Sequence, residues 1–471
     1  MIIVKTITII KTRIEILEAE NRELRNQLIT AHSIISMLEA TVTKLESTVT
    51  KLEVRIDELE HKKDSNNSSI PPSKDENRKT KSLRKKSGKN TGGQPGHKGS
   101  TLKMRDKVDE VVDHSPNFCQ ACGSGLQADK KLRSRRQVID IPPIKPVVTE
   151  HRVYERKCMN CGHNNCGSFP DQVKSPVSYG NGIMTLVAYL SVRQYISMNR
   201  IQEILGSVFN VNMSEGTVKN QLSTYANKCN WIYEQIRLRL LRAHWIGTDE
   251  TGYRLNGKKA WMWTWQNDKY TLLHASTNRG TQTINEVYPA GLANSILLHD
   301  CWKPHFRIAS RTHQLCLVHL LRELEYFIEK RTHKWAYDFA KLLRKSIQLK
   351  DNLMDEHCLG FNHAKSIQHH EDCATSLIDQ TINTNNKKLL AFQKRMKKYR
   401  SYLFTFLHHE SIPYENNSSE RAIRNMKVKM KVSGMFKTYE GAQNFAKIRS
   451  VIDTCAKNNK SIFSALSLVP E

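Results

Sequence analysis

The sequence predicts a multidomain α+β protein, and three observations lead to this fold class. Residues 14–59 repeat apolar side chains every seven positions, and Cys-x2-Cys pairs occur at 119–122 and 158–161. Strand-like segments of alternating polarity lie between residues 244 and 298. A chain of 471 residues is long enough for two to four domains. We therefore expect helical, cysteine-containing and sheet-containing parts to fold as separate domains.

Residues 1–62 are predicted to form one helix that pairs with a second chain. β-branched residues dominate the first heptad seam and leucines the second, which favours a parallel two-stranded coiled coil, or leucine zipper, and hence a homodimer. Asn21 is a polar seam residue of the kind that fixes register. The alternative is a long amphipathic helix folded back on its own domain, but seven heptads exceed an ordinary globular helix. The first seam holds Ile14, Asn21, Leu28, Ile35, Val42, Val49 and Ile56, and the second holds Leu17, Leu24, Ala31, Leu38, Leu45, Leu52 and Leu59.

The net charge indicates a polyanionic partner. Lys and Arg number 73 against 46 Asp and Glu, a net charge of +27. Contacts between such cations and phosphates release counterions and stabilise nucleic-acid complexes. A basic ribosomal or membrane-surface protein is the alternative, but such proteins tend to be short or to carry an amphipathic anchor. No stretch approaches the roughly 20 apolar residues of a membrane span.

Residues 63–107 are predicted to be a basic, disordered linker. From Asn66 to Lys107 the chain is rich in Asn, Ser, Pro, Gly, Lys and Arg and has no apolar period. The segment is either a solvated spacer or an arm that contacts DNA phosphates, and its charge density favours the arm.

Residues 108–170 are predicted to bind a structural zinc ion. The thiols of Cys119 and Cys122 form one pair, and those of Cys158 and Cys161 form another. Tetrahedral zinc needs four ligands, and two tight turns can present four thiolates. Free cysteines are the alternative. Paired metal spacing and an odd total of 11 cysteines also favour a reducing cytoplasm.

Two local features support this zinc domain. Gly123 and Gly162 each follow a cysteine pair, where a knuckle turn requires backbone freedom. The segments 136–141 and 147–155 have strand-like composition, which predicts a zinc-ribbon-like domain.

Residues 171–240 are predicted to be helical and to contain a helix-turn-helix. The segment 199–209 forms the first helix and 210–213 the turn, and Ser214 caps a second helix over 215–225. The second helix then either reads DNA or only packs against its neighbours. Its candidate DNA contacts are Thr217, Lys219, Asn220 and Gln221.

Residues 241–324 are predicted to begin an α/β catalytic core. A strand at 244–248 leads into Asp249, and Asn256-Gly257 is typical of a type I′ hairpin turn. Strands at 259–266 and 270–275 follow, with alternating tryptophans in the first of them.

A helix over 281–288 and a fourth strand over 295–298 complete this pattern. Three antiparallel strands, a helix and a fourth strand give the order of a ribonuclease H-like fold. The first and fourth strands are neighbours in that fold, so Asp249 and Asp300 are expected to lie side by side. Adjacent carboxylates repel each other and favour a hard cation such as Mg²⁺, or Mn²⁺ in its place.

Residues 413–471 are predicted to supply a third carboxylate, from Glu420. It lies near the start of a helix that we expect Asn417 or Ser418 to cap. Phosphodiester chemistry uses one metal ion at the attacking oxygen and another at the leaving oxygen. The alternatives are solvated acids at strand ends and an ion pair between Glu420 and Arg424. Basic residues suited to phosphate follow: Arg421, Arg424, Lys427, Lys429 and Lys431.

Together these segments resemble the transposases of the bacterial insertion-sequence-66 family. The resemblance runs in order from about residue 14 to the C-terminus. The matching motifs are Gly92-Gly93-Gln94-Pro95-Gly96-His97-Lys98-Gly99, the two cysteine pairs, Asp249-Glu250-Thr251, His299-Asp300-Cys301-Trp302, His319-Leu320-Leu321-Arg322-Glu323-Leu324, Asn416-Asn417-x2-Glu420-Arg421-Ala422, Lys431-Val432-Ser433-Gly434-Met435-Phe436 and Ile448-Arg449-Ser450.

The resemblance implies a DDE transposase that acts on the terminal inverted repeats of an insertion sequence. Asp249, Asp300 and Glu420 carry over as its catalytic, metal-binding residues. Residues 325–412 would be a helical insertion, and Arg322 a phosphate contact. Cys301 replaces a glycine that is common in the family. The resemblance also implies a cytoplasmic, nucleoid-associated bacterial protein that binds double-stranded terminal and target DNA, with small accessory proteins of the same element as potential partners.

Two further interpretations follow. The His313-x2-Cys316-x2-His319 pattern is not expected to bind metal, because residues six apart on a helix diverge.

A dimeric zinc-containing DNA-binding regulator, or a domesticated inactive transposase, is the alternative to the enzyme. Substitution of the carboxylates distinguishes the two, since only the enzyme would lose strand cleavage.

Overall fold

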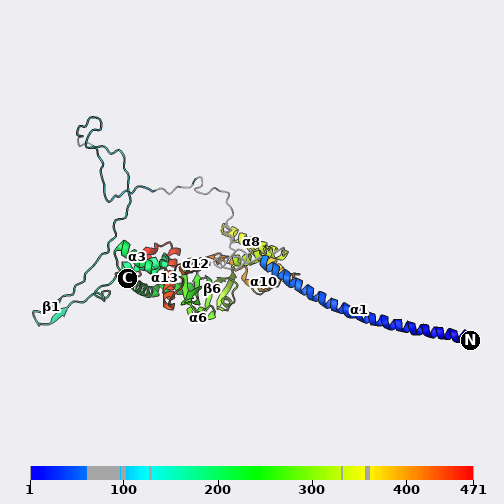
Figure 1. Cartoon of the computed structure of the whole chain (residues 1–471). Coiled ribbons are helices and arrows are strands. Elements are labelled where there is room, and N and C mark those ends of the chain that lie inside the picture. Colours follow the sequence, from blue (N-terminus) through cyan, green and yellow to red (C-terminus); the bar gives the residue numbers. More distant parts are fainter. Residues whose placement is uncertain are drawn as a thin grey trace. The chain divides into compact units, whose positions relative to one another are not determined.

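The computed structural model describes residues 2–60, 96, 102–126, 130–329, 333–355 and 361–469 (Figure 1). The chain divides into two compact units. The first comprises Met1–Arg78, His319–Arg344 and Gln380–Leu390, and the second comprises the remaining residues. Most of the predicted linker and most of the Gly92–Gly99 motif lie outside the described residues.

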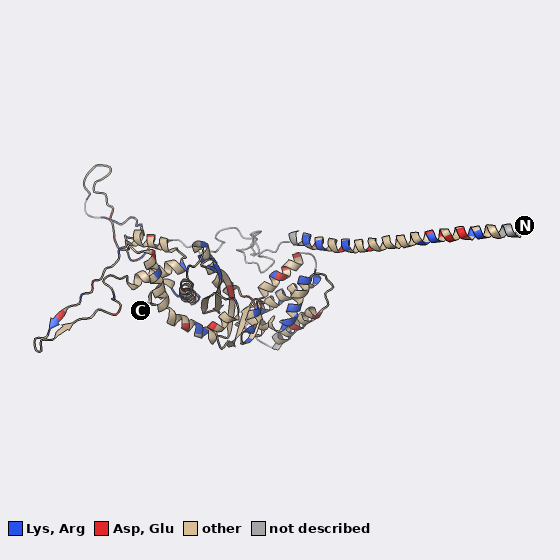
Figure 2. Cartoon of the chain, turned by 60° about the horizontal axis from the view of Figure 1, so that its bottom comes forward, with Lys and Arg blue, Asp and Glu red and all other residues tan. Residues whose placement is uncertain are grey.

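In the first unit, the N-terminal segment is a single helix, α1 (Ile2–Glu60), as the heptads predict. Acidic and basic residues are interspersed along it (Figure 2). The large apolar side chains of both seams from Ile14 to Ile56 are between 44% and 61% exposed. Leucine and isoleucine in such numbers are unfavourable in water, so the seams are an unfilled packing surface.

In the second unit, the residues around the cysteine pairs form little regular structure. The strands expected at 136–141 and 147–155 are wrong in position, because a short hairpin of β1 (Glu155–Lys157) and β2 (Asn164–Cys166) forms instead. Three prolines within 142–146 remove ladder donors there. Val138 and Val147 are 94% and 93% exposed, so neither segment has a layer to pack against.

Two helices joined by a short turn form where the helix-turn-helix is predicted. Helix α3 ends at Phe209, and Asn210 follows it in the left-handed conformation at φ 52°. Ser214 then caps α4, and its Oγ accepts a hydrogen bond from the backbone N–H of Thr217 at 3.1 Å. This helical region consists of α2 (Asn181–Ala188), the π-helical turn η1 (Tyr189–Arg193), α3 (Met198–Phe209), α4 (Glu215–Lys228) and α5 (Asn230–Leu241).

A five-stranded mixed sheet follows, in the order β5-β4-β3-β6-β7. The first three strands along the chain are antiparallel, and β3, β6 and β7 run parallel. Asn256 and Gly257 both have positive φ, at 45° and 75°, as a type I′ turn requires. The elements are β3 (Trp245–Leu255), β4 (Lys258–Gln266), β5 (Thr271–Ser276), α6 (Thr281–Val287), β6 (Leu292–His299), the 3-10 turn η2 (Lys303–Arg307) and β7 (Ser310–Leu315).

The prediction that the first and fourth strands are neighbours is confirmed by the β3–β6 pair. Strand β7 was not predicted.

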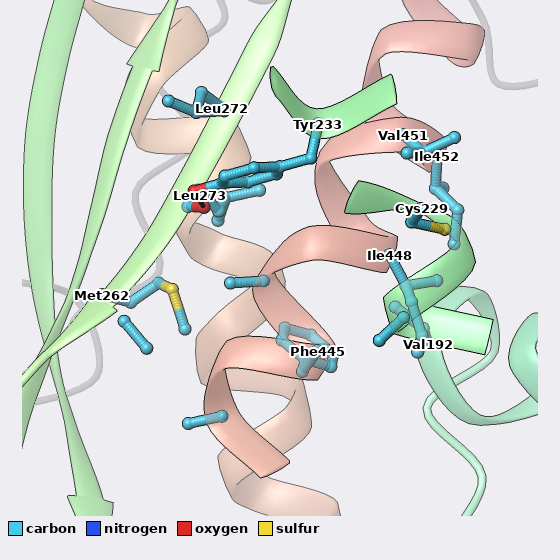
Figure 3. Packing of buried hydrophobic residues seen from close by; sticks show 14 of the residues in the cluster. Val192, Cys229, Tyr233, Met262, Leu272, Leu273, Phe445, Ile448, Val451 and Ile452 are labelled. Atoms are coloured by element: carbon cyan, nitrogen blue, oxygen red, sulfur yellow. Dashed lines mark hydrogen bonds between the residues drawn. The ribbon is translucent and has the colours of Figure 1, made fainter. Parts of the chain in front are cut away.

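Helix α13 (Tyr439–Lys457) packs against the sheet and against the helical region, and Figure 3 shows this core. Phe445, Ile448 and Ile452 line α13, and the Tyr233 hydroxyl donates a hydrogen bond to the Leu273 carbonyl at 3.0 Å. The sheet, α4 and α5 therefore share one apolar core.

Helices make up most of the described chain between β7 and residue 469. The segment expected as an insertion holds most of α7 (Leu317–Glu329), α8 (Lys334–Asp355), α9 (Phe361–Asp379), α10 (Lys387–Lys398), η3 (Arg400–Tyr402) and α11 (Thr405–His408). Helices α12 (Asn417–Ser433) and α14 (Ile462–Ser467) lie on either side of α13 in the chain. None of the described helices is long and apolar enough to traverse a lipid bilayer.

Candidate functional site

Asp249 lies in the middle of β3, because the strand expected to end before it continues to Leu255. Asp300 directly follows the end of β6, which runs parallel to β3. Gly247 of β3 is paired with Leu298 of β6, and extending this register by two residues places Asp249 opposite Asp300. Neighbouring strands are about 4.8 Å apart, so this register brings the backbones of Asp249 and Asp300 close together.

Backbone donors fix both carboxylates. The Oδ1 atom of Asp249 accepts a hydrogen bond from the N–H of Glu250 at 2.9 Å. The Oδ1 atom of Asp300 accepts one from the N–H of Trp302 at 3.1 Å.

A buried polar network attaches the N-terminus of α12, and with it Glu420, to β3. The Nδ2 atom of Asn416 donates to the Thr248 carbonyl at 2.8 Å. The Ser419 hydroxyl donates to Oδ1 of Asn416 at 2.6 Å and accepts from Nε2 of Gln266 at 3.1 Å. Glu420 follows in the first turn of α12, with its N–H on the Asn416 carbonyl at 3.2 Å. The network thus ties this turn to the residue that precedes Asp249.

Gly247 makes this attachment sterically possible. A Cβ atom at position 247 would lie 2.6 Å from Nε2 of Gln266, 2.7 Å from Oδ1 of Asn416 and 2.8 Å from Oγ of Ser419. Real Cβ atoms do not approach so closely, so the close approach of α12 to β3 requires glycine there.

The expectation that Asn417 or Ser418 caps this helix is wrong. Helix α12 begins at Asn417, and Asn416 occupies the N-cap position without a side-chain cap bond. The Asn416 side chain is 2% exposed and bonds to Thr248 and Ser419 instead. Attachment to the sheet therefore replaces ordinary capping at this terminus.

The face of α12 that carries Glu420 is basic. Arg424, Lys427 and Lys431 follow Glu420 by 4, 7 and 11 residues and so share its face. Arg424 and Lys431 are exposed, and Lys427 donates from Nζ to the Gly252 carbonyl at 3.1 Å.

The other residues expected to contact DNA lie on three different helices. Arg421 is exposed on α12, and Lys219 and Asn220 are exposed on α4. Arg322 is half-buried on α7, in the first unit. Lys429, on the opposite face of α12 from Glu420, is buried, and loss of hydration lowers its pKa to about 8.

Three buried histidines form a cluster next to Asp300, and no sequence pattern singled out His305 among them. His299 Nε2 is 3.0 Å from His313 Nδ1, and the His299 and His305 rings are 4.9 Å apart. Burial lowers the pKa of His313 to about 4 and that of His299 far below its usual value. The His299 and His313 rings are therefore neutral at pH 7. The placement of His313 and His319 on one helix is wrong, because His313 is on β7 and His319 is on α7.

Each cysteine pair forms the expected knuckle turn. The N–H of Gly123 donates to the Cys119 carbonyl, and that of Gly162 to the Cys158 carbonyl, both at 2.9 Å. Gly123 and Gly162 have φ of 75° and 73°. Hydrogen bonding with Ser124, whose Oγ is 3.4 Å from Sγ, lowers the pKa of Cys122 to about 7. Backbone hydrogen bonds from Cys161 and Asn160 lower the pKa of Cys158. Such acidic thiols suit a thiolate-binding metal.

The donor sets fit two different metals. Carboxylate oxygens from Asp249, Asp300 and Glu420 are ligands of the type that Mg²⁺ or Mn²⁺ takes, and four thiols are ligands of the type that zinc takes. Within the described ranges, no three acidic, histidine or cysteine side chains converge in a metal-binding arrangement. The structure therefore brings the strands of Asp249 and Asp300 together and forms each knuckle, but within the described residues it gathers neither ligand set.

Comparison with known families decides the affiliation of the chain. Residues 176–444, more than half of the 471, match the model of the Transposase IS66 family. The chain belongs to the IS66 transposase family. Residues 116–162 of this IS66 family member match the zinc-finger binding domain of transposase IS66, which supports a structural zinc. Residues 9–103 match a family of unknown function. A search of curated proteins found no match.

Proposed function

We propose that this IS66 family member is a DNA transposase that cuts the ends of an insertion sequence and joins them to target DNA. Asp249, Asp300 and Glu420 are its catalytic residues. One observation carries the proposal: Asp249 lies within β3, Asp300 directly follows the parallel neighbour β6, and the helix of Glu420 is attached to β3 at Thr248. The strand order β5-β4-β3-β6-β7 supports a ribonuclease H-like core.

The chemistry requires a water to attack a phosphodiester and the freed 3′-hydroxyl to attack the target. Mg²⁺ or Mn²⁺, when bound by the three carboxylates, supplies charge stabilisation at the attacking and leaving oxygens. The residues of the chain orient the reacting groups, since in-line phosphoryl transfer depends on positioning. The basic face of α12 is placed to bind the phosphates on either side of the reacting one.

DNA recognition is assigned to two further regions. Lys219 and Asn220 lie exposed on α4, the second helix of the helix-turn-helix, where such helices read the major groove. The basic segment 63–107 would add contacts to phosphates that do not depend on sequence.

The test is an assay of binding and cleavage on labelled DNA that carries the ends of the element, with accessory proteins added. A transposase gives cuts at the ends with Mg²⁺ and none with EDTA. Binding without cleavage by the wild-type chain under all these conditions would instead establish the alternative, a dimeric DNA-binding regulator.

The exposed seams of α1 support a parallel two-stranded coiled coil with a second copy of the chain. Leu38 lies in the second seam, whereas Met37 is 65% exposed outside both seams. We expect Leu38→Lys to convert a dimer to a monomer, because it places a charge in the dimer core. Met37→Lys adds the same charge and leaves the dimer intact. Analytical ultracentrifugation measures the mass, and a monomeric wild-type chain would refute the coiled coil.

The two knuckles are proposed to share one zinc ion through Cys119, Cys122, Cys158 and Cys161. We expect Cys158→Ser to abolish zinc retention, because three thiolates and a hydroxyl bind the ion much less tightly. Cys166 is an exposed cysteine on β2. The matched control Cys166→Ser is expected to keep the ion. Native mass spectrometry counts the zinc, and equal zinc in the Cys158 variant would rule out this ligand set.

A further inference from the structure

Two cations and two tryptophans form a layered cluster beside the candidate active site. The guanidinium carbon of Arg279 lies 4.6 Å from the ring centroid of Trp261 and 4.3 Å from that of Trp302. The Nζ atom of Lys259 also lies 4.6 Å from the Trp261 ring. We call Lys259, Trp261, Arg279 and Trp302 the cationic stack.

Arg279 is held in one orientation and is still accessible. Its Nε and Nη2 atoms lie 2.9 and 2.8 Å from Oε1 of Glu250. The Glu250 side chain is 3% exposed, whereas that of Arg279 is 44% exposed. The other Glu250 oxygen is 3.4 Å from Nε2 of the buried His305. A guanidinium has five N–H donors, so the contacts to Glu250 leave donors for a further acceptor.

Glu250 and Trp302, which contact Arg279, each donate a backbone N–H to the side chain of a proposed metal ligand. Trp302 donates its N–H to Asp300 at 3.1 Å, and Glu250 donates its N–H to Asp249 at 2.9 Å. A ligand bound by Arg279 would therefore lie next to the reacting phosphodiester.

The charge of the cluster indicates an anion as that ligand. Lys259 and Arg279 bring two positive charges, and Glu250 brings one negative charge, which leaves an excess of one positive charge. A purely structural role for Arg279 would be to neutralise the buried Glu250 carboxylate. That role requires neither a guanidinium that is 44% exposed nor a second cation, Lys259, on the same tryptophan ring. A rigid guanidinium with spare donors is, in contrast, well suited to a phosphate.

We propose that the cationic stack binds a backbone phosphate of the DNA strand next to the bond that is cut. Its placement beside the cut rests on the proposed function, but the phosphate contact itself does not require cleavage. The tryptophans fix the cations, so that phosphate binding costs little side-chain entropy.

The test is the salt dependence of DNA binding by the full-length chain, with a duplex that carries the end of the element as the probe. The plot of log K against log salt has a negative slope. Removal of one cation from a DNA phosphate lowers the magnitude of this slope by about 0.9. The double variant Glu250→Gln/Arg279→Gln removes the cation without leaving a buried carboxylate unpaired. Lys259→Gln is an independent surface variant, and Lys258→Gln removes an equal charge from the neighbouring exposed position of β4.

We expect the double variant and Lys259→Gln each to lower the magnitude of the slope by about 0.9, and Lys258→Gln to leave it unchanged. Wild-type slopes in the double variant and in Lys259→Gln would overturn the proposal. An equal fall in Lys258→Gln would overturn it too, because diffuse charge would then explain the effect. If the slopes fall as expected but the wild-type chain cuts nothing, the phosphate site stands and the proposed catalysis fails. Failure of the wild-type chain to bind DNA would overturn both.

Discussion

Glu420→Gln is expected to slow end cleavage on the order of 10³-fold, because a neutral amide replaces a charged metal ligand. The change is isosteric, and the bonds of Asn416 and Ser419 that attach α12 to the sheet do not involve this side chain. Thermal stability and DNA binding should therefore stay close to wild type. Single-turnover cleavage of end-labelled DNA measures the effect.

Glu440→Gln is the matched control for this prediction. Glu440 also lies in the first turn of a helix, α13, where it accepts a hydrogen bond from Ser223 at 2.7 Å. Its replacement should leave cleavage within about twofold, since a surface hydrogen bond contributes only about 1 kcal/mol to stability and none to the reaction. A Glu420→Gln chain that cuts as fast as Glu440→Gln would remove Glu420 from the catalytic residues.

Gly247→Ala is expected to lower stability by roughly 2–4 kcal/mol and to impair cleavage severely. The added methyl group would overlap Gln266, Asn416 and Ser419, all of them buried. Either α12 moves away from β3 or the network breaks, and each outcome displaces Glu420 from Asp249. Thermal denaturation and the cleavage assay together measure both consequences.

Gly252→Ala, five residues along the same strand, controls for the replacement of a glycine. A Cβ atom there has its nearest neighbour at 3.6 Å, an ordinary contact with the Lys259 side chain. We expect this variant to be nearly as stable as wild type. Equal behaviour of the two alanine variants would contradict the steric account of the α12 attachment.

Much of the fold was predictable because it depends on local signals. The turn at 210–213, the Ser214 cap and the Asn256-Gly257 turn each depend on residues within the segment itself, and all three form as predicted. The heptads predicted α1 for the same reason. The pairing of β3 with β6 also followed from the order of elements.

The remaining features depend on contacts distant in sequence. Strand β7, with the sequence Ser-Arg-Thr-His-Gln-Leu, lacks a run of apolar residues and is defined by its pairing with β6. The segment 136–141 has the composition of a strand but no partner. Ser419 bonds to Gln266 across 153 residues, and Asn416 bonds to Thr248 across 168, so one sequence cannot reveal the network.

The candidate site also has some features that local sequence predicts and others that depend on distant contacts. Asp249, Asp300 and Glu420 could be proposed from strand ends, a helix start and a family resemblance. The roles of Gly247, Asn416 and the cationic stack became visible only from distances in the folded chain.

The most direct test of the central claim is to locate the metal on the chain itself. Fe²⁺ replaces Mg²⁺ in the full-length protein, and ascorbate with peroxide then generates radicals that cut the backbone near the bound ion. We predict cuts near residues 249, 300 and 420, which excess Mg²⁺ suppresses and Asp249→Asn abolishes at all three positions together. Cuts confined to one of these positions, or cuts elsewhere that Mg²⁺ suppresses, would show that the three carboxylates do not form one metal site.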